Sequence, residues 1–183
     1  MTEESFARYE DQVALATAAE GGTIAAVDNN REQLDRAMGA FAGAGGGPHR
    51  AYPADALQPG EVDAVVAEVA ERFGKIDILL NGVGGLTAIS SPAATTEQLT
   101  MAEWQRVVDF NLNGTFLFCH AVIPHMTRQG GGKIVNFASI AGRGRSQASS
   151  SAYAAAKGCI IAFTTKLAAE VGPAGINVNA ISP

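Results

Sequence analysis

Basic residues are scarce in this sequence. Its 183 residues include 13 Lys and Arg against 18 Asp and Glu, a formal net charge of −5, and no basic run is longer than a pair. This balance argues against binding to a nucleic-acid groove or to an anionic membrane surface. We therefore expect neither nucleic acid nor a membrane among its partners.

Long apolar runs are missing as well. No apolar stretch reaches the roughly 18 residues that a membrane-spanning helix requires. The polar start at Thr2, Glu3 and Glu4 does not resemble a signal peptide. Together these features predict a cytoplasmic protein.

Cysteine and histidine are few, with two and three residues respectively. Cys119 and Cys159 stand in apolar, helix-like surroundings without a CxxC motif or a nearby histidine. We expect both to be buried structural thiols, with a disulfide or a nucleophile as the alternatives. His49, His120 and His125 do not have the spacing of a metal site, so no metal is predicted.

Apolar residues, in contrast, make up 47% of the chain, and charged residues 17%, which suits one domain with a sizeable core. Apolar strand-like segments alternate with helical patterns of ten or more residues. The expected strands are Val13–Leu15, Thr23–Val27, His49–Tyr52, Ile76–Leu80, Lys133–Ala138 and Ile176–Ile181, and the expected helices are Arg31–Phe41, Gly60–Phe73, Met101–Met126 and Ala152–Val171. This order predicts a single α/β domain over residues 1–183, a Rossmann-like doubly wound parallel sheet with helices on both faces.

Polar side chains follow the ends of these strands. In a parallel sheet the carboxyl ends of the strands meet at one edge, which is where such sheets bind ligands. We therefore expect five side chains to converge there: Asp28, Asp55, Asn81, Ser139 and Tyr153.

Tyr153 and Lys157 have the spacing of neighbours on one helix face. At an effective dielectric of about 20, a positive charge ~4 Å from a phenol is worth roughly 4 kcal/mol, or about three pKa units. Such a phenol can exchange a proton with an alcohol or ketone near neutral pH. Tyr-x-x-x-Lys also occurs by chance, but here it follows a strand that ends in Ser139 and a glycine-rich loop.

Two acidic residues fit a nucleotide. Asp28 ends a strand where a carboxylate can accept hydrogen bonds from an adenosine ribose, and it would repel a 2′-phosphate. This favours NAD over NADP, while capping of the next helix is the alternative role. Asp55 can contact an adenine or cap a helix.

The remaining candidates each have an ordinary alternative. Asn81, Gly82, Val83 and Gly84 form a turn where a flat ligand could approach the backbone, or a plain strand-to-loop turn. Asn111 lies in a helical segment that disfavours Asn; it either kinks the helix around a water-held carbonyl or satisfies a local polar group. Ser139 can face a substrate oxygen or simply form a turn.

These residues together resemble the short-chain dehydrogenase/reductase family, in particular its 3-oxoacyl-ACP reductase-like members. The resemblance runs from about Thr23 to Pro183. The motifs that carry it are Asp77–Gly84, Phe110–Gly114, Lys133–Gly142, Tyr153–Lys157 and Ile176–Pro183.

The resemblance implies NAD(P)-dependent hydride transfer between a secondary alcohol and a ketone. Tyr153 would be the general acid/base, and Lys157 would lower its pKa and bind the nicotinamide ribose. Ser139 would hold the substrate oxygen, and Asn111 would anchor a water in the proton relay. A homo-oligomer, commonly a tetramer, would form through the long helices, at 116–123 and 159–163.

Two departures from the family leave a second interpretation open. Only Ala16–Gly22 separate Leu15 from Thr23, too few for the glycine-rich loop and helix that receive a pyrophosphate in the family. The family also continues beyond the position of Pro183 with a substrate-covering loop. The alternative is therefore a non-catalytic, truncated relative that binds cofactor weakly or not at all and acts through a helical interface.

Overall fold

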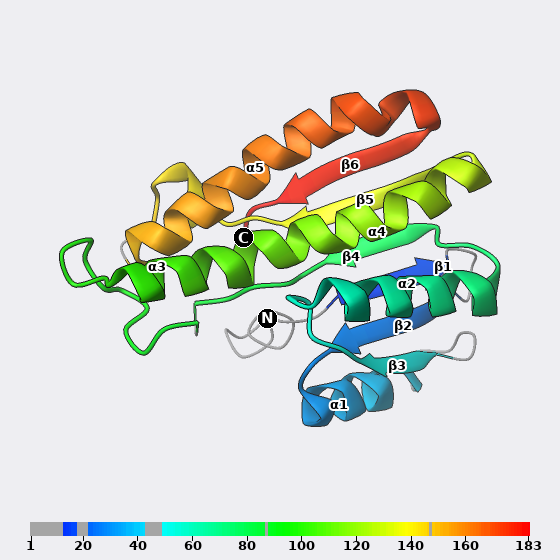
Figure 1. The fold of residues 1–183 in the computed structure, drawn as a ribbon, viewed down its shortest axis with the longest axis horizontal. Coiled ribbons are helices and arrows are strands. Elements are labelled where there is room, and N and C mark those ends of the chain that lie inside the picture. The colour runs from blue at the N-terminus through cyan, green and yellow to red at the C-terminus, as the bar shows by residue number, and fades with distance from the viewer. Residues whose placement is uncertain (1–12, 18–21, 43–48, 87, 147) are drawn as a thin grey trace.

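The computed structural model describes residues 13–17, 22–42, 49–86, 88–146 and 148–183. Their strands form one sheet in the order β3-β2-β1-β4-β5-β6 (Figure 1). The strands are β1 (Val13–Thr17), β2 (Thr23–Asp28), β3 (Arg50–Pro53), β4 (Ile78–Asn81), β5 (Gly132–Phe137) and β6 (Ile176–Ile181). The prediction of an α/β, Rossmann-like fold is confirmed.

One strand departs from the predicted parallel arrangement. β2 pairs with β3, β4 with β5 and β5 with β6 in parallel, but β1 is antiparallel to both β2 and β4. Val13 lies opposite Val27 and Asn81, whereas Thr17 lies opposite Thr23. The short connection over residues 18–22 explains the reversal, because a parallel crossover needs a dozen or more residues.

Helices alternate with the strands as expected. They are α1 (Arg31–Ala42), α2 (Pro59–Phe73), α3 (Met101–Val108), α4 (Gly114–Gln129) and α5 (Ser151–Val171), with short 3-10 turns η4 (Ile140–Arg143) and η5 (Gly172–Ala174). The single helix expected over Met101–Met126 is instead α3 and α4 joined by a π-helix, η3 (Asp109–Asn113). Thr100 begins α3 with a capping box to Glu103, and Gly130, with φ of 88°, ends α4.

The main core lies between the sheet and the layer formed by α2, α4 and α5 (Figure 1). Alternate strand residues such as Leu79, Ile134 and Ile176 are buried there, as the period of two predicts. Phe118 of α4 and Val66 of α2 pack onto them. This layer packs β4, β5 and the second half of α5 into one core.

The second face of the sheet is covered less completely. α1 contacts β2 and β3, and its Leu34 and Ala37 are buried. Over β4 and β6, Leu80 and Ile181 remain 38% and 43% exposed, and no helix among the described residues covers them. Helices therefore lie on both faces, as predicted, but on the second face only at β2 and β3.

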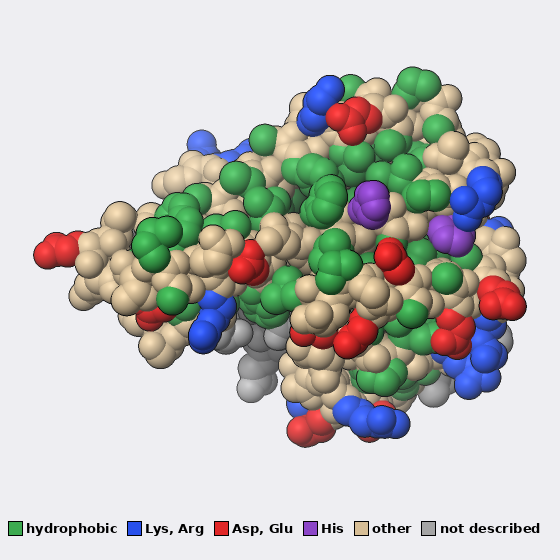
Figure 2. All heavy atoms as spheres, viewed as in Figure 1, with side chains coloured by type: hydrophobic (Ala, Val, Ile, Leu, Met, Phe, Trp, Pro, Cys, Tyr) green, Lys and Arg blue, Asp and Glu red, His purple; other side chains and the backbone are tan. Residues whose placement is uncertain are grey.

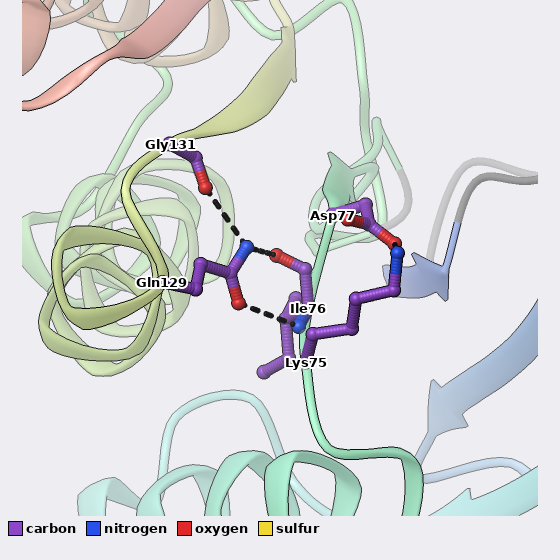
Figure 3. A network of polar contacts seen from close by, with 5 residues as sticks. All are labelled: Lys75, Ile76, Asp77, Gln129 and Gly131. Carbon is purple, nitrogen blue, oxygen red and sulfur yellow. Dashed lines mark hydrogen bonds and ion pairs between the residues drawn. The ribbon is translucent and has the colours of Figure 1, made fainter.

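The edge of the sheet where β4 starts is tied to the end of α4 (Figure 3). Gln129 Oε1 accepts from the Ile76 N–H at 3.1 Å, and Nε2 donates to the carbonyls of Ile76 at 2.7 Å and Gly131 at 2.8 Å. Beside them Lys75 Nζ lies 3.0 Å from Asp77 Oδ2. These contacts fix β4 at the edge opposite the candidate site.

The outer surface of α4 and α5 is partly apolar. Figure 2 shows hydrophobic side chains over these helices and acidic ones over α2. Phe116 is 48% exposed, and its ring lies against those of His120 and Phe163. Cys119 is buried, as predicted, but Cys159 is exposed, which contradicts the prediction of a buried thiol. No helix in the described ranges is long and apolar enough to span a membrane.

Candidate active site

A cavity of about 240 Å³ opens at the edge where β4 and β5 end. Three of the predicted catalytic residues line it together: Ser139 after β5, and Tyr153 and Lys157 on α5. The glycine turn after β4 forms another wall. Its lining residues are Gly82, Gly84, Gly85, Leu86, Phe137, Ala138, Ser139, Ser146, Ser149, Tyr153, Lys157 and Pro183.

The start of α5 is held firmly. Ser150 caps the helix, with its Oγ accepting from the Tyr153 N–H at 3.3 Å, and its own N–H donates to the Pro92 carbonyl at 2.7 Å. Ile89, Val107 and Ala152 form a small second core, against which Tyr153 packs. The tyrosine ring is therefore supported on one side while the residue lines the cavity.

Lys157 joins α5 to the end of β5. The residue is only 3% exposed, and its Nζ donates to the Phe137 carbonyl at 2.9 Å. The same Nζ lies 5.6 Å from the centre of the Tyr153 ring, within the range of a cation–π contact. The structure thus places the ammonium beside the phenol ring, as the i, i+4 spacing predicted.

Ser139 begins the η4 turn. Its Oγ accepts from the Ala141 N–H at 3.2 Å. This turn lies directly on α5, because a Cβ added to Gly142 would stand 2.6 Å from the Gly158 nitrogen and 2.7 Å from the Lys157 carbonyl carbon. Only a residue without a side chain allows this approach, which fixes the turn bearing Ser139 against the helix bearing Tyr153 and Lys157.

Asn111 lies in the π-helix with its side chain fully buried. Its Oδ1 accepts from the Gly85 N–H at 3.0 Å, and its Nδ2 donates to the carbonyls of Gly85 at 3.2 Å and Val107 at 3.0 Å. A side chain on Gly84, whose φ is 118°, would collide with this amide. The Asn111 side chain thus holds the glycine turn and does not line the cavity, while its carbonyl accepts from Thr115 Oγ1 at 3.1 Å.

Asn81 lies beneath the turn rather than in the cavity. Its side chain is fully buried, and its Nδ2 donates to the Thr115 carbonyl at 2.8 Å and contacts Cys119 Sγ at 3.6 Å. Cys119 in turn donates to Asn136 Oδ1 at 3.6 Å. Burial raises the pKa of the Cys119 thiol from its ordinary 9.0 to about 12, so the group stays protonated. The structure does not bring the Asn81 side chain to either cavity at this edge.

A second cavity of about 240 Å³ lies on the other side of the turn and includes Asp28, Asp55 and Val83 in its lining. Asp28 Oδ1 accepts from the Asn30 N–H at 2.7 Å. Asn30 makes the capping bond at the start of α1, accepting from the Gln33 N–H at 3.1 Å, so Asp28 is not the helix cap. Asp55 Oδ1 accepts from the Leu57 N–H at 2.9 Å, a local turn contact.

Ser146 and Ser149 are not among the site residues predicted from the sequence, but both line the first cavity. The available signal was their place between Ser139 and the Tyr153 helix, a segment that can face the site. Among the described residues, no group of three His, Cys, Asp or Glu side chains could hold a metal ion.

The end of β1 lies away from this edge. Thr17 pairs with Thr23, the first residue of β2, while Val13 pairs with Asn81 beside the cavities. β1 therefore ends at the edge of the sheet opposite the one where β2 and β4 end.

Comparison with known proteins matches the chain to the short chain dehydrogenase family over residues 11–183. The chain is 45% identical over 168 residues to short-chain reductase protein NovJ of Streptomyces niveus. It is 41% identical over 171 residues to D-threitol dehydrogenase of Mycolicibacterium smegmatis. These alignments cover 91% and 93% of the chain but 60% and 63% of the relatives. The chain thus spans about 60% of the length of these curated relatives.

Solved structures of dehydrogenases and reductases match the fold of this chain. NAD+-bound xylitol dehydrogenase is 36% identical with a TM-score of 0.80, over 88% of this chain and 60% of that one. A 3-oxoacyl-[acyl-carrier protein] reductase with bound NAD from Brucella melitensis is 35% identical with a TM-score of 0.77, over the same shares. Sequence, fold and the grouping of Ser139, Tyr153 and Lys157 lead to one conclusion: the chain belongs to the short-chain dehydrogenase/reductase family.

Proposed function

We propose that the protein is an NAD(P)-dependent oxidoreductase that interconverts a secondary alcohol and a ketone. The observation that carries this proposal is the shared cavity of Ser139, Tyr153 and Lys157. The Lys157 ammonium lies 5.6 Å from the centre of the Tyr153 ring. An ammonium so placed favours the phenolate, which is what a phenol needs to act as an acid and base near neutral pH.

Three residues of the cavity, and Asn111 beside it, have a proposed part in the reaction. Tyr153 takes the proton from the alcohol oxygen during oxidation and returns it during reduction. Ser139 holds that oxygen with a hydrogen bond, and Lys157 stabilises the charge on Tyr153. The Asn111 carbonyl, which accepts from Thr115 Oγ1, retains a second lone pair for a water in the proton relay.

A nicotinamide cofactor would supply or accept the hydride. The residues present fit its two ends: the glycine turn exposes backbone between the two cavities, and carboxylates line the second. We propose that Gly82, Val83 and Gly84 contact the cofactor through their backbone and that Lys157 and Tyr153 contact the nicotinamide ribose. Asn81 contributes by holding the turn.

Asp28 would give the cofactor preference. It lines the second cavity and is not the cap of α1, which supports contact with the adenosine ribose. A carboxylate at this place favours NAD over a cofactor with a 2′-phosphate. Asp55 in the same cavity would contact the adenine.

The α4 and α5 surface is proposed to join copies of the chain into a homo-oligomer. Phe116, half exposed, and Phe163 form an apolar contact there. Burying such side chains at an interface is favourable by roughly 25 cal/mol per Å².

A second candidate, a non-catalytic relative that acts through this helical surface, is favoured by one specific observation. β1 is antiparallel to its neighbours, and the pyrophosphate therefore lacks the helix and loop that it would meet after a parallel first strand.

Titration with NADH and NADPH, followed by nicotinamide fluorescence, separates the two candidates. Binding of NADH, together with reduction of NAD by a small polyol such as D-threitol, supports the oxidoreductase. The polyol is chosen because relatives are named as D-threitol and xylitol dehydrogenases. No fluorescence change at millimolar cofactor and no turnover would support the non-catalytic relative.

A further inference from the structure

Two serines line the cavity of Tyr153 without a part in the proposed proton transfer. Ser146 and Ser149 belong to the segment between η4 and α5. Together with Ser139 and Tyr153 they bring four hydroxyl groups to a space of about 240 Å³. This group of hydroxyls suits a small substrate with more than one oxygen, bound beside the nicotinamide end of the cofactor.

Ser149 differs from its neighbours in hydrogen bonding. Ser150 Oγ accepts from the Tyr153 N–H, and Ser151 Oγ lies 2.9 Å from Thr96 Oγ1. Ser149 Oγ, in contrast, is covered from solvent and has no hydrogen-bond partner among the described residues. A buried hydroxyl left unpaired costs about 1–3 kcal/mol, so its presence calls for an explanation.

A bound ligand can provide the missing partner. Serine side chains occupy three staggered rotamers, and a change of rotamer would carry Oγ toward the cavity that Ser149 lines. The Ser149 hydroxyl would then form a hydrogen bond only when a substrate oxygen is present. This makes the bond selective, because a substrate without that oxygen leaves the hydroxyl unpaired.

The charges around the cavity restrict the chemistry of the second group. Among the described residues that line the cavity, Lys157 carries a charged side chain. Its Nζ donates a hydrogen bond to the Phe137 carbonyl. No Arg, Asp or Glu is in that lining. A neutral oxygen is therefore favoured over a carboxylate, a phosphate or an amine.

We propose that Ser149 binds a second, neutral oxygen of the substrate, on the carbon next to the reacting one. The substrate class is then a small vicinal diol, oxidised to the hydroxyketone, in preference to a simple secondary alcohol. This inference rests on the proposed function and names the substrate class of the same site.

The test compares 2,3-butanediol with 2-butanol as substrates for NAD reduction. We expect the wild-type kcat/KM to be at least about tenfold higher for the diol than for 2-butanol, because one additional hydrogen bond contributes about that factor. Ser149→Ala should reduce that ratio by about tenfold, with 2-butanol turnover unchanged within about twofold. Ser151→Ala is the matched control. It removes a hydroxyl from the first residue of α5, which does not line the cavity, and should leave the ratio of the two kcat/KM values unchanged.

Ligand-observed NMR with the same two alcohols makes the test independent of turnover. Selective binding of the diol that Ser149→Ala abolishes supports the inference, even if neither alcohol is oxidised; in that case only the proposed function fails. An equal preference in wild type and Ser149→Ala, or no binding of either alcohol, overturns the inference. A large drop in the Tm of Ser149→Ala would also overturn it, since it would reveal a structural partner for the hydroxyl.

Discussion

The edge of the sheet that carries the candidate site has two halves built in different ways. In the half formed by β4, β5 and α5, the parallel strands end side by side at Asn81 and Phe137, and Ser139, Tyr153 and Lys157 line one cavity. In the half formed by β1 and β2, only β2 ends at this edge. β1 begins there instead, with Val13 opposite Val27.

The hydrogen bonds and close contacts described here around Tyr153 do not involve β1. These contacts come from η4, α5, and the segments before them: Ser150 with Pro92, Gly142 with Gly158, and Lys157 with Phe137. We therefore expect proton transfer and binding of the adenosine end of the cofactor to depend on different parts of the chain. Variants in the two halves should therefore affect different measurements.

The largest effect is expected in the first half, from Tyr153→Phe. Removal of the phenolic hydroxyl should lower kcat by about 10²–10⁴, the usual contribution of a general acid and base. The dissociation constant of NADH, measured by fluorescence, should rise by no more than about tenfold, since at most one hydrogen bond to the nicotinamide ribose is lost. Equal losses in kcat and in NADH binding would contradict a division of roles between the two halves.

A bulky side chain at Gly142 should disturb the same half through its packing. In Gly142→Val the new side chain meets the backbone of Lys157 and Gly158, so we expect the free energy of unfolding to fall by about 1–3 kcal/mol and kcat to fall with it. Gly39→Ala is the control, because nothing lies within 4 Å of the added methyl. Gly39 lies in the last turn of α1, so its replacement by alanine should raise the free energy of unfolding by up to about 1 kcal/mol, measured by urea denaturation.

The sequence predicted the first half well because its signals are local. Tyr153 and Lys157 share a helix face by spacing alone, and Ser139 follows a strand of clear apolar pattern. The π-helix was missed, since its five residues are too few to change the apolar pattern of the longer helical segment, and the Asn111 bonds to Gly85 join residues 26 apart. Cys159 was placed wrongly because α5 is apolar on most of its surface, so periodicity does not mark its exposed side.

The half formed by β1 and β2 was harder to predict, because the apolar pattern of a short strand does not show in which direction the strand runs in the sheet. An apolar strand reads the same whether it pairs in parallel or antiparallel. The short segment Ala16–Gly22 excluded a helical crossover, but the reversal of β1 depends on pairing with β2 and β4, which lie on both sides of it.

Asp28→Asn tests this second half. Loss of the carboxylate removes its repulsion of a 2′-phosphate, so the ratio of NADPH to NADH affinity should rise by about tenfold, equivalent to about 1.4 kcal/mol. Asp55→Asn removes a carboxylate from the same cavity, but its proposed contact is with the adenine that both cofactors share. It should therefore leave the ratio within about twofold, and a similar change in both variants would contradict the role of Asp28.

The smallest effect concerns Cys119, which lies beneath the first half between Asn81 and Asn136. Its folded pKa is raised from 9.0 to about 12 by burial, so the unfolded chain releases this proton first as the pH rises. Its contribution to stability is complete below pH 9 and is lost as the pH rises toward 12. Between about pH 8 and about pH 9.5 the wild type should lose about 0.8 kcal/mol through this group. Cys119→Ser does not titrate there, so the difference in unfolding free energy between the two proteins should change by this amount. Parallel pH curves would show that the thiol is not held protonated beneath the ends of β4 and β5.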